Sequence, residues 1–104
     1  MPRHEPLQLV FQHRLRAARE MKELSQKQLG VNAGLDPFVA SARINRYEQG
    51  VHQPDLGTVE RLAEALAVPP AYLFAGNERL ARMILAFDKL SPSEQERLLR
   101  DVAG

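Results

Sequence analysis

Two helix-start signals lie close together in the first half of the chain, with a glycine between them. Ser25 followed by Gln28 has the spacing of a capping box, which predicts a helix beginning directly after the serine. Gly34 suits the left-handed conformation that commonly ends a helix. Asp36-Pro37 then places an N-cap acceptor before a proline at the first helical position, so a second helix is predicted from Pro37 to about Gln49. This pair of short helices is the strongest constraint on the fold.

Apolar residues elsewhere recur at helical spacing, and no segment alternates with a period of two for long enough to form a strand. The fold class is therefore all-α: a compact bundle of four helices plus a short fifth, with a C-terminal two-helix extension. The predicted helices cover about residues 7–22, 26–33, 37–49, 59–66, 71–74, 80–87 and 92–102.

The chain divides into three parts by composition. Residues 1–6 contain two prolines and no periodicity, which predicts a flexible N-terminal arm, and residues 7–76 form the main domain. The extension, residues 77–104, carries two apolar stripes. These stripes either pack against the core or form a dimer interface. They consist of Leu80, Ile84 and Phe87, and of Leu98, Leu99 and Val102.

Composition argues against several classes of protein. The chain has no cysteine, and its three histidines lack metal-ligand spacing, so neither a metal nor another cofactor is expected. No apolar run approaches the roughly 20 residues of a membrane span. The N-terminus has no apolar region typical of a secretory signal, so a cytoplasmic location without membrane contact is the expectation. No nucleophile–base arrangement is present, and an enzyme is not expected.

Charge is distributed unevenly along the chain. Residues 1–54 contain eight Lys and Arg against five Asp and Glu, whereas residues 55–104 contain six against eight. A basic front half and a mildly acidic back half suit a module that presents one face to a polyanion.

The segments "HRLRAAREMKELSQKQLGVNAGL" and "INRYEQGVHQPDLGTVERLAEALAVPPAYLF" bring these signals together. Their ordered motifs, L-S-Q, A-G-L, I-x-x-Y-E-x-G, P-D and L-A-x-A-L-x-V, resemble the phage-repressor/Cro-type (XRE) helix-turn-helix domain over about residues 11–74.

The resemblance implies a sequence-specific regulator of transcription that binds double-stranded DNA. Its simplest form is a repressor that binds a palindromic operator as a homodimer. Two alternatives stay open. The chain could be an antitoxin that represses its own operon and binds a protein partner, the toxin, or it could be a protein-interaction module that has kept the fold.

The resemblance also assigns roles to single residues. Gln26 lies at the start of the first short helix, where backbone N–H groups attract an anion, and its amide is expected to contact a phosphate. Lys27 is expected to contact phosphate as well. Arg19 and Glu48 match a pair of positions in the family that tie the first helix to the recognition helix.

A helical wheel of the recognition helix, at about 100° per residue, separates an inner from an outer face. Ala40, Ile44 and Tyr47 fall on the inner face. Arg46 on the outer face could bond guanine, and Asn45 could bond adenine or a phosphate. We call the outer residues and their flanks the reading face; they are Ser41, Ala42, Arg43, Asn45 and Arg46.

The sequence departs from the family between the two glycines, Gly34 and Gly50. About four more residues separate them than in the usual pattern, which is about one helical turn. We therefore expect the recognition helix to begin one turn early. The added turn contains Phe38 and Val39, which either pack against the preceding helix and extend the core, as we expect, or reach the DNA. A second departure is Gly30, where the family usually has alanine.

Overall fold

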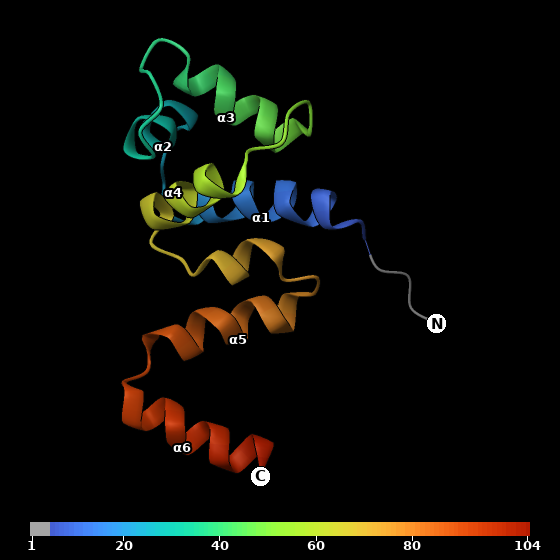
Figure 1. Ribbon diagram of the computed structural model, residues 1–104, viewed down its shortest axis with the longest axis vertical. Helices are drawn as coiled ribbons and strands as arrows, with labels where there is room; N and C mark the ends of the chain where they lie inside the picture. Colours follow the sequence, from blue (N-terminus) through green and yellow to red (C-terminus); the bar gives the residue numbers. More distant parts are fainter. Residues whose placement is uncertain (1–4) are drawn as a thin grey trace.

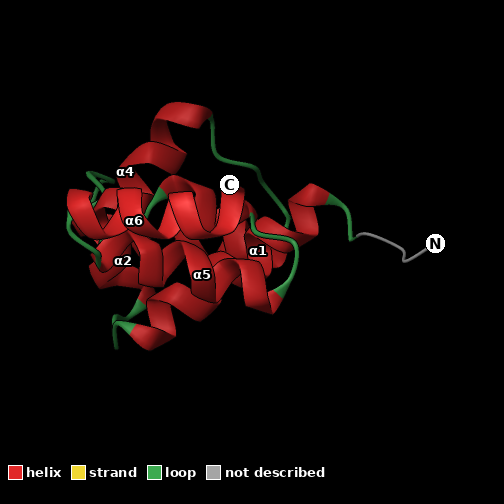
Figure 2. Cartoon of the chain, turned by 90° about the horizontal axis from the view of Figure 1, so that it is seen from below, coloured by secondary structure: helices red, strands yellow, loops and turns green. Residues whose placement is uncertain are grey.

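Residues 5–104, which the computed structural model describes, fold into helices joined by short loops and contain no strand (Figures 1 and 2). The all-α bundle with a two-helix extension is confirmed. Most of the predicted N-terminal arm, residues 1–4, lies outside the described residues. The elements are α1 (Leu7–Met21), α2 (Gln26–Asn32), α3 (Ala40–Gln49), α4 (Leu56–Leu66), the 3-10 helix η1 (Pro70–Phe74), α5 (Glu78–Lys89) and α6 (Pro92–Ala103).

The capping signals act as predicted at α2. The Ser25 hydroxyl accepts a hydrogen bond from the Gln28 amide at 3.0 Å, and the Gln28 side chain accepts one from the Ser25 amide at 2.8 Å. Gly34 follows the helix with a φ of +89°, a left-handed conformation that favours glycine. Both ends of α2 are therefore fixed by local sequence.

The core lies around α1, which runs between α3 on one side and η1 on the other (Figure 1). Phe11 of α1 stacks on Phe74 of η1, with ring centroids 5.6 Å apart. This contact places the short helix η1 over the core. The largest fully buried side chains are Leu15, Leu29, Ile44, Leu62, Leu66 and Leu73.

The predicted start of α3 is wrong, because the helix begins at Ala40 and not at Pro37. The Asp36 carboxylate accepts a hydrogen bond from the amide of Phe38, two residues on, at 2.8 Å. An N-cap aspartate makes the same bond to the second residue of a helix, so this side-chain bond alone does not distinguish a helix start from a turn. The backbone does, because the Val39 carbonyl accepts from the Arg43 amide at 2.8 Å in the helical pattern, whereas the bond that precedes it spans only three residues. A further bond, from the Val39 amide to the Asp36 carbonyl at 3.0 Å, closes a turn. The surplus residues therefore lengthen the turn and not the helix.

The expected packing of Phe38 against the core is also wrong. Its side chain is 98% exposed, and that of Val39 is 41% exposed. The close approach of α2 and α3 accounts for Gly30, since a Cβ atom there would lie 2.7 Å from the Cβ of Ala40. Alanine at position 30 would push the two helices apart, so the departure from the family pattern serves helix packing.

The extension meets the core through α5 and not through α6. Its first helix, α5, packs on η1 and buries only Ala81, and α6 buries no residue at all. Arg14 of α1 fixes the start of α5, because its Nε donates to the Ala75 carbonyl at 3.0 Å and its Nη1 to Glu78 Oε2 at 2.8 Å. The Gln95 side chain then donates to the Phe87 carbonyl at 2.8 Å, which joins α6 to α5. The alternative in which both stripes pack against the core does not hold for α6.

Candidate nucleic-acid interface

The outer face of α3 is open to solvent along its whole length. All five residues of the reading face are exposed, whereas Ala40, Ile44 and Tyr47 are buried, as the wheel predicted. In Figure 1, α3 lies at one end of the molecule, opposite α6. No element of the described chain therefore covers this helix on its outer side.

An ion pair anchors α3 from beneath. Arg19 Nε donates to Glu48 Oε2 at 2.6 Å, and Arg19 Nη2 donates to Glu48 Oε1 at 3.1 Å. The third guanidinium nitrogen donates to the Leu24 carbonyl at 2.9 Å. The Glu48 side chain is 1% exposed and that of Arg19 14%. The hydrogen bond to Glu48 raises the pKa of Arg19 further above its ordinary value. The tie predicted between the first helix and the recognition helix is thus present.

Gln26 connects this ion pair to the reading face. Its Nε2 donates to Glu48 Oε1 at 3.2 Å and to Asn45 Oδ1 at 3.1 Å. Because an amide nitrogen carries two hydrogens, both are used inside the protein. A bond from this amide to a phosphate would have to replace one of them. The phosphate contact of Gln26 therefore stays a prediction, beside an internal role that the sequence did not reveal.

The network also sets which way the Asn45 amide points. The Glu48 carboxylate can only accept hydrogen bonds, so Gln26 must turn its nitrogen toward it. The same nitrogen meets Asn45, which must then turn its oxygen toward Gln26. The Asn45 Nδ2 is left to face outward, so this side chain offers donors to whatever approaches α3.

The two arginines of the reading face differ in their surroundings. Arg43 Nη2 donates to the Tyr47 hydroxyl at 3.2 Å, which holds the guanidinium along its own helix. Arg46 makes no side-chain hydrogen bond or ion pair with any residue from 5 to 104, and the same is true of Lys27 in α2. Ser41 and Ala42 precede both arginines on α3, and their side chains have only one or two heavy atoms. Close approach of a ligand is therefore possible at this end of the helix.

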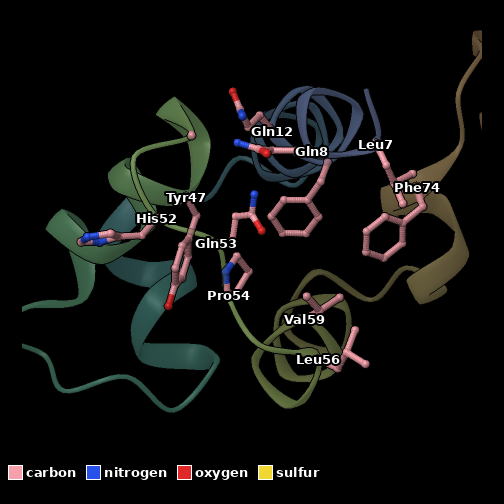
Figure 3. Close-up of a pocket in the computed structure, with 12 residues that line it drawn as sticks. Leu7, Gln8, Gln12, Tyr47, His52, Gln53, Pro54, Leu56, Val59 and Phe74 are labelled. Carbon is pink, nitrogen blue, oxygen red and sulfur yellow. The ribbon is translucent and has the colours of Figure 1, made fainter. Parts of the chain in front are cut away.

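A shallow groove of about 380 Å³ lies between the start of α1, the loop after α3 and η1 (Figure 3). Figure 3 shows Leu7, Leu56, Val59 and Phe74 on one part of its wall and Gln53 near its centre. The lining includes His52 but no carboxylate, lysine or arginine.

Among residues 5–104, no group of three or more histidine and carboxylate side chains is arranged to hold a metal ion. No helix in the same range is long and apolar enough to cross a membrane.

Comparisons with known proteins agree with this geometry. A family model described as helix-turn-helix matches residues 15–73. The chain is 30% identical over 96 residues to the cryptic phage CTXphi transcriptional repressor RstR of Vibrio cholerae, with 86% of this chain and 81% of that protein covered. It is 34% identical over 61 residues to the uncharacterized HTH-type transcriptional regulator y4wC of Sinorhizobium fredii (strain NBRC 101917 / NGR234), with 59% of this chain and 40% of that protein covered.

A solved structure is also similar. The crystal structure of the transcriptional regulator BswR superposes with a TM-score of 0.82 at 44% sequence identity. The match covers 88% of this chain and 91% of that one, so it includes much of the extension as well as the domain that precedes it.

Proposed function

Because the chain belongs to the XRE-type helix-turn-helix family of DNA-binding transcriptional regulators, we propose that it is a repressor that binds a palindromic operator as a homodimer. The observation that carries this proposal is the reading face, which is exposed on a helix anchored from beneath by the Arg19–Glu48 ion pair. An anchored, uncovered helix can enter the major groove without rearrangement.

The reading face supplies the sequence-dependent contacts of this proposal. Arg46, whose guanidinium has no partner among residues 5–104, donates two hydrogen bonds to the O6 and N7 atoms of guanine. Asn45 donates from Nδ2 to an acceptor on a neighbouring base or on a phosphate. Ser41 and Ala42 let the helix approach the base edges, and Arg43 lies at the flank.

Phosphate contacts supply affinity and orientation. Lys27 is exposed near the start of α2. It follows Gln26, whose side chain donates a hydrogen bond to Asn45. Its ammonium group contacts the backbone of the DNA, and Gln26 assists by holding Asn45 and, after exchange of one hydrogen bond, by contacting phosphate itself. Such contacts fix the position of the protein on DNA without reading sequence.

The extension provides the dimer interface in this proposal. Exposed apolar side chains continue from α5 to α6, on the side of the extension that does not pack against the core. Burying these side chains against a second copy would remove them from water. They are Leu80, Met83, Leu99 and Val102, with 48%, 51%, 46% and 77% of their surface exposed.

Selection of bound duplexes from a random library tests the proposal. We expect two inverted half-sites whose centres are about 34 Å apart, or a multiple of that spacing, as two-fold symmetry requires. A single non-repeated half-site would contradict the homodimer. Binding that falls with salt but shows no preferred sequence would contradict the operator.

A further inference from the structure

Phe38 is the most exposed large apolar side chain of the described residues, at 98%. The backbone of the turn fixes this exposed position. Pro37 precedes it with a fixed φ, and the Asp36 carboxylate and carbonyl accept hydrogen bonds from the amides of Phe38 and Val39 at 2.8 and 3.0 Å. The turn therefore presents the aromatic ring in a defined place.

The position of this turn relative to α3 is fixed as well. Ala40, two residues after Phe38, is fully buried where α2 and α3 approach each other at Gly30. The start of α3 cannot move without opening that contact. Phe38 is thus attached, over two residues, to a rigid point of the core.

The turn lies directly before α3, whose reading face begins at Ser41, three residues after Phe38. Figure 1 shows the connection between α2 and α3 at the end of the molecule that α3 occupies, on the side away from α1. A surface that meets the outer side of α3 near Ser41 and Ala42 therefore also meets the turn.

The chemistry of the turn excludes a phosphate anchor. Residues 35–39 are Leu-Asp-Pro-Phe-Val, with one carboxylate and no lysine or arginine. The group that this turn offers is the ring of Phe38. In the major groove, the apolar group on a base edge is the 5-methyl of thymine.

We propose that Phe38 contacts the 5-methyl group of a thymine in the major groove, at the end of each half-site that faces the start of α3. This inference rests on the function proposed above. It makes Phe38 a specificity-determining residue that the shorter turn of the family pattern lacks.

The test uses the full chain and the best duplex that the wild-type protein selects from a random library. Phe38→Ala should lower affinity for that duplex by about tenfold, whereas affinity for random duplex stays nearly unchanged. The matched control is Leu56→Ala, which truncates another exposed apolar side chain, 81% exposed, outside the turn. Both variants should keep the wild-type Tm, because neither side chain is part of the core.

Deoxyuridine in place of single thymines locates the contact, because it removes only the methyl group. One thymine in each half-site should be sensitive. Replacing that thymine in a single half-site should lower the affinity of the wild-type protein about fourfold, which corresponds to the burial of one methyl group. The Phe38→Ala variant should lose nothing further at that position. Equal losses for the two proteins at every thymine would overturn the proposal.

Three other outcomes distinguish failure of the Phe38 contact from failure of the proposed function. A Phe38→Ala variant that binds the selected duplex like the wild type overturns the contact, while the selected duplex itself still supports the proposed function. A variant that changes oligomeric state but not half-site preference assigns Phe38 to a protein surface and also overturns the contact. Failure to select any duplex overturns both this inference and the proposed function.

Discussion

The guanidinium of Arg19 and the carboxylate of Glu48 form a two-bond ion pair that joins α1 to the recognition helix, α3. One carboxylate oxygen also accepts from Gln26, whose amide holds Asn45 on the exposed side of α3. A buried charge pair thus fixes both the position of the helix and the orientation of one side chain on its reading face.

Glu48→Gln should lower the free energy of unfolding by about 3–5 kcal/mol, because it leaves the guanidinium of Arg19 without a charge partner. Urea denaturation measures this loss. The control is Arg16→Ala, which removes an exposed pair with Glu20 at 3.0 Å and should change stability by less than about 1 kcal/mol. Equal effects of the two variants would show that the Arg19–Glu48 pair does not anchor α3.

Gln26→Met should relax discrimination at the base that Asn45 faces, because Asn45 loses the partner that orients its amide. Binding to operator variants changed at that base measures the effect. In the double variant with Asn45→Ala, discrimination at that base should be no worse than in Asn45→Ala alone, since coupled residues are not additive. Additive losses, uniform across sequences, would instead assign Gln26 to a phosphate contact only.

The N-cap of α4 predicts a pH dependence. A hydrogen bond from the Thr58 amide, at 2.7 Å, lowers the pKa of Asp55 below its ordinary 3.8. Because the folded state holds the charged form, this contribution to stability is present above the ordinary pKa and is lost as pH falls through the lower folded value. Asp55→Asn keeps an acceptor without the charge. At pH 7 the Tm of this variant should be lower than that of the wild type. The two Tm values should approach each other as the pH falls below about 3.8. A constant difference in Tm across this range would contradict the assignment.

Much of the fold follows from local sequence. The capping box at Ser25, the glycine at position 34 and the apolar stripes act within one or two helical turns, so α1, α2 and the later helices appear where these signals place them. The apolar stripe of α4 begins at Val59, and the helix itself begins three residues earlier, at Leu56, because its N-cap is Asp55.

The start of α3 could not be predicted in the same way. Asp36-Pro37 can begin a helix or close a turn, and both use the same residues. Here Asp36 bonds to the amide of Phe38 and closes a turn, and the contact between Gly30 and Ala40 sets where the helix begins. That contact joins residues of two helices, so the sequence shows Gly30 as unusual but does not show that Ala40 is its partner.

The candidate site likewise has some features that local sequence predicts and others that depend on contacts between helices. Helical periodicity predicts which residues of α3 face outward, and the exposure of the reading face agrees. Periodicity does not predict the hydrogen bonds from Gln26 to Asn45 and Glu48. These bonds join α2 to α3 and depend on the positions of the side-chain ends in space. The DNA contacts of individual residues stay predictions.

Val102→Asp should weaken self-association, because it places a charge on the exposed apolar stripe of α6, where the native side chain is 77% exposed. The mass in solution, measured by light scattering over a range of concentrations, should shift from dimer toward monomer. Arg97→Asp is the matched control, since position 97 lies on the opposite side of the helical wheel from this stripe. A wild-type chain that is monomeric at the concentrations of DNA binding would rule out the dimer interface.

Lys27→Ala should weaken binding to all duplexes to a similar degree. It removes one positive charge from the proposed phosphate contacts, so the slope of log affinity against log salt should become shallower by about one. Titrations of operator and random duplex at several salt concentrations measure the slope. An unchanged slope would remove Lys27 from the phosphate contacts.

The affinity ratio between operator and random duplex, compared for the wild type and Arg46→Ala, tests the central claim most directly. If α3 reads bases through Arg46, the variant should lose about 10- to 100-fold on the operator and little on random DNA, so that the ratio falls. Equal losses on both duplexes would contradict the claim, because they would make Arg46 a phosphate contact and leave the reading face without its principal base contact.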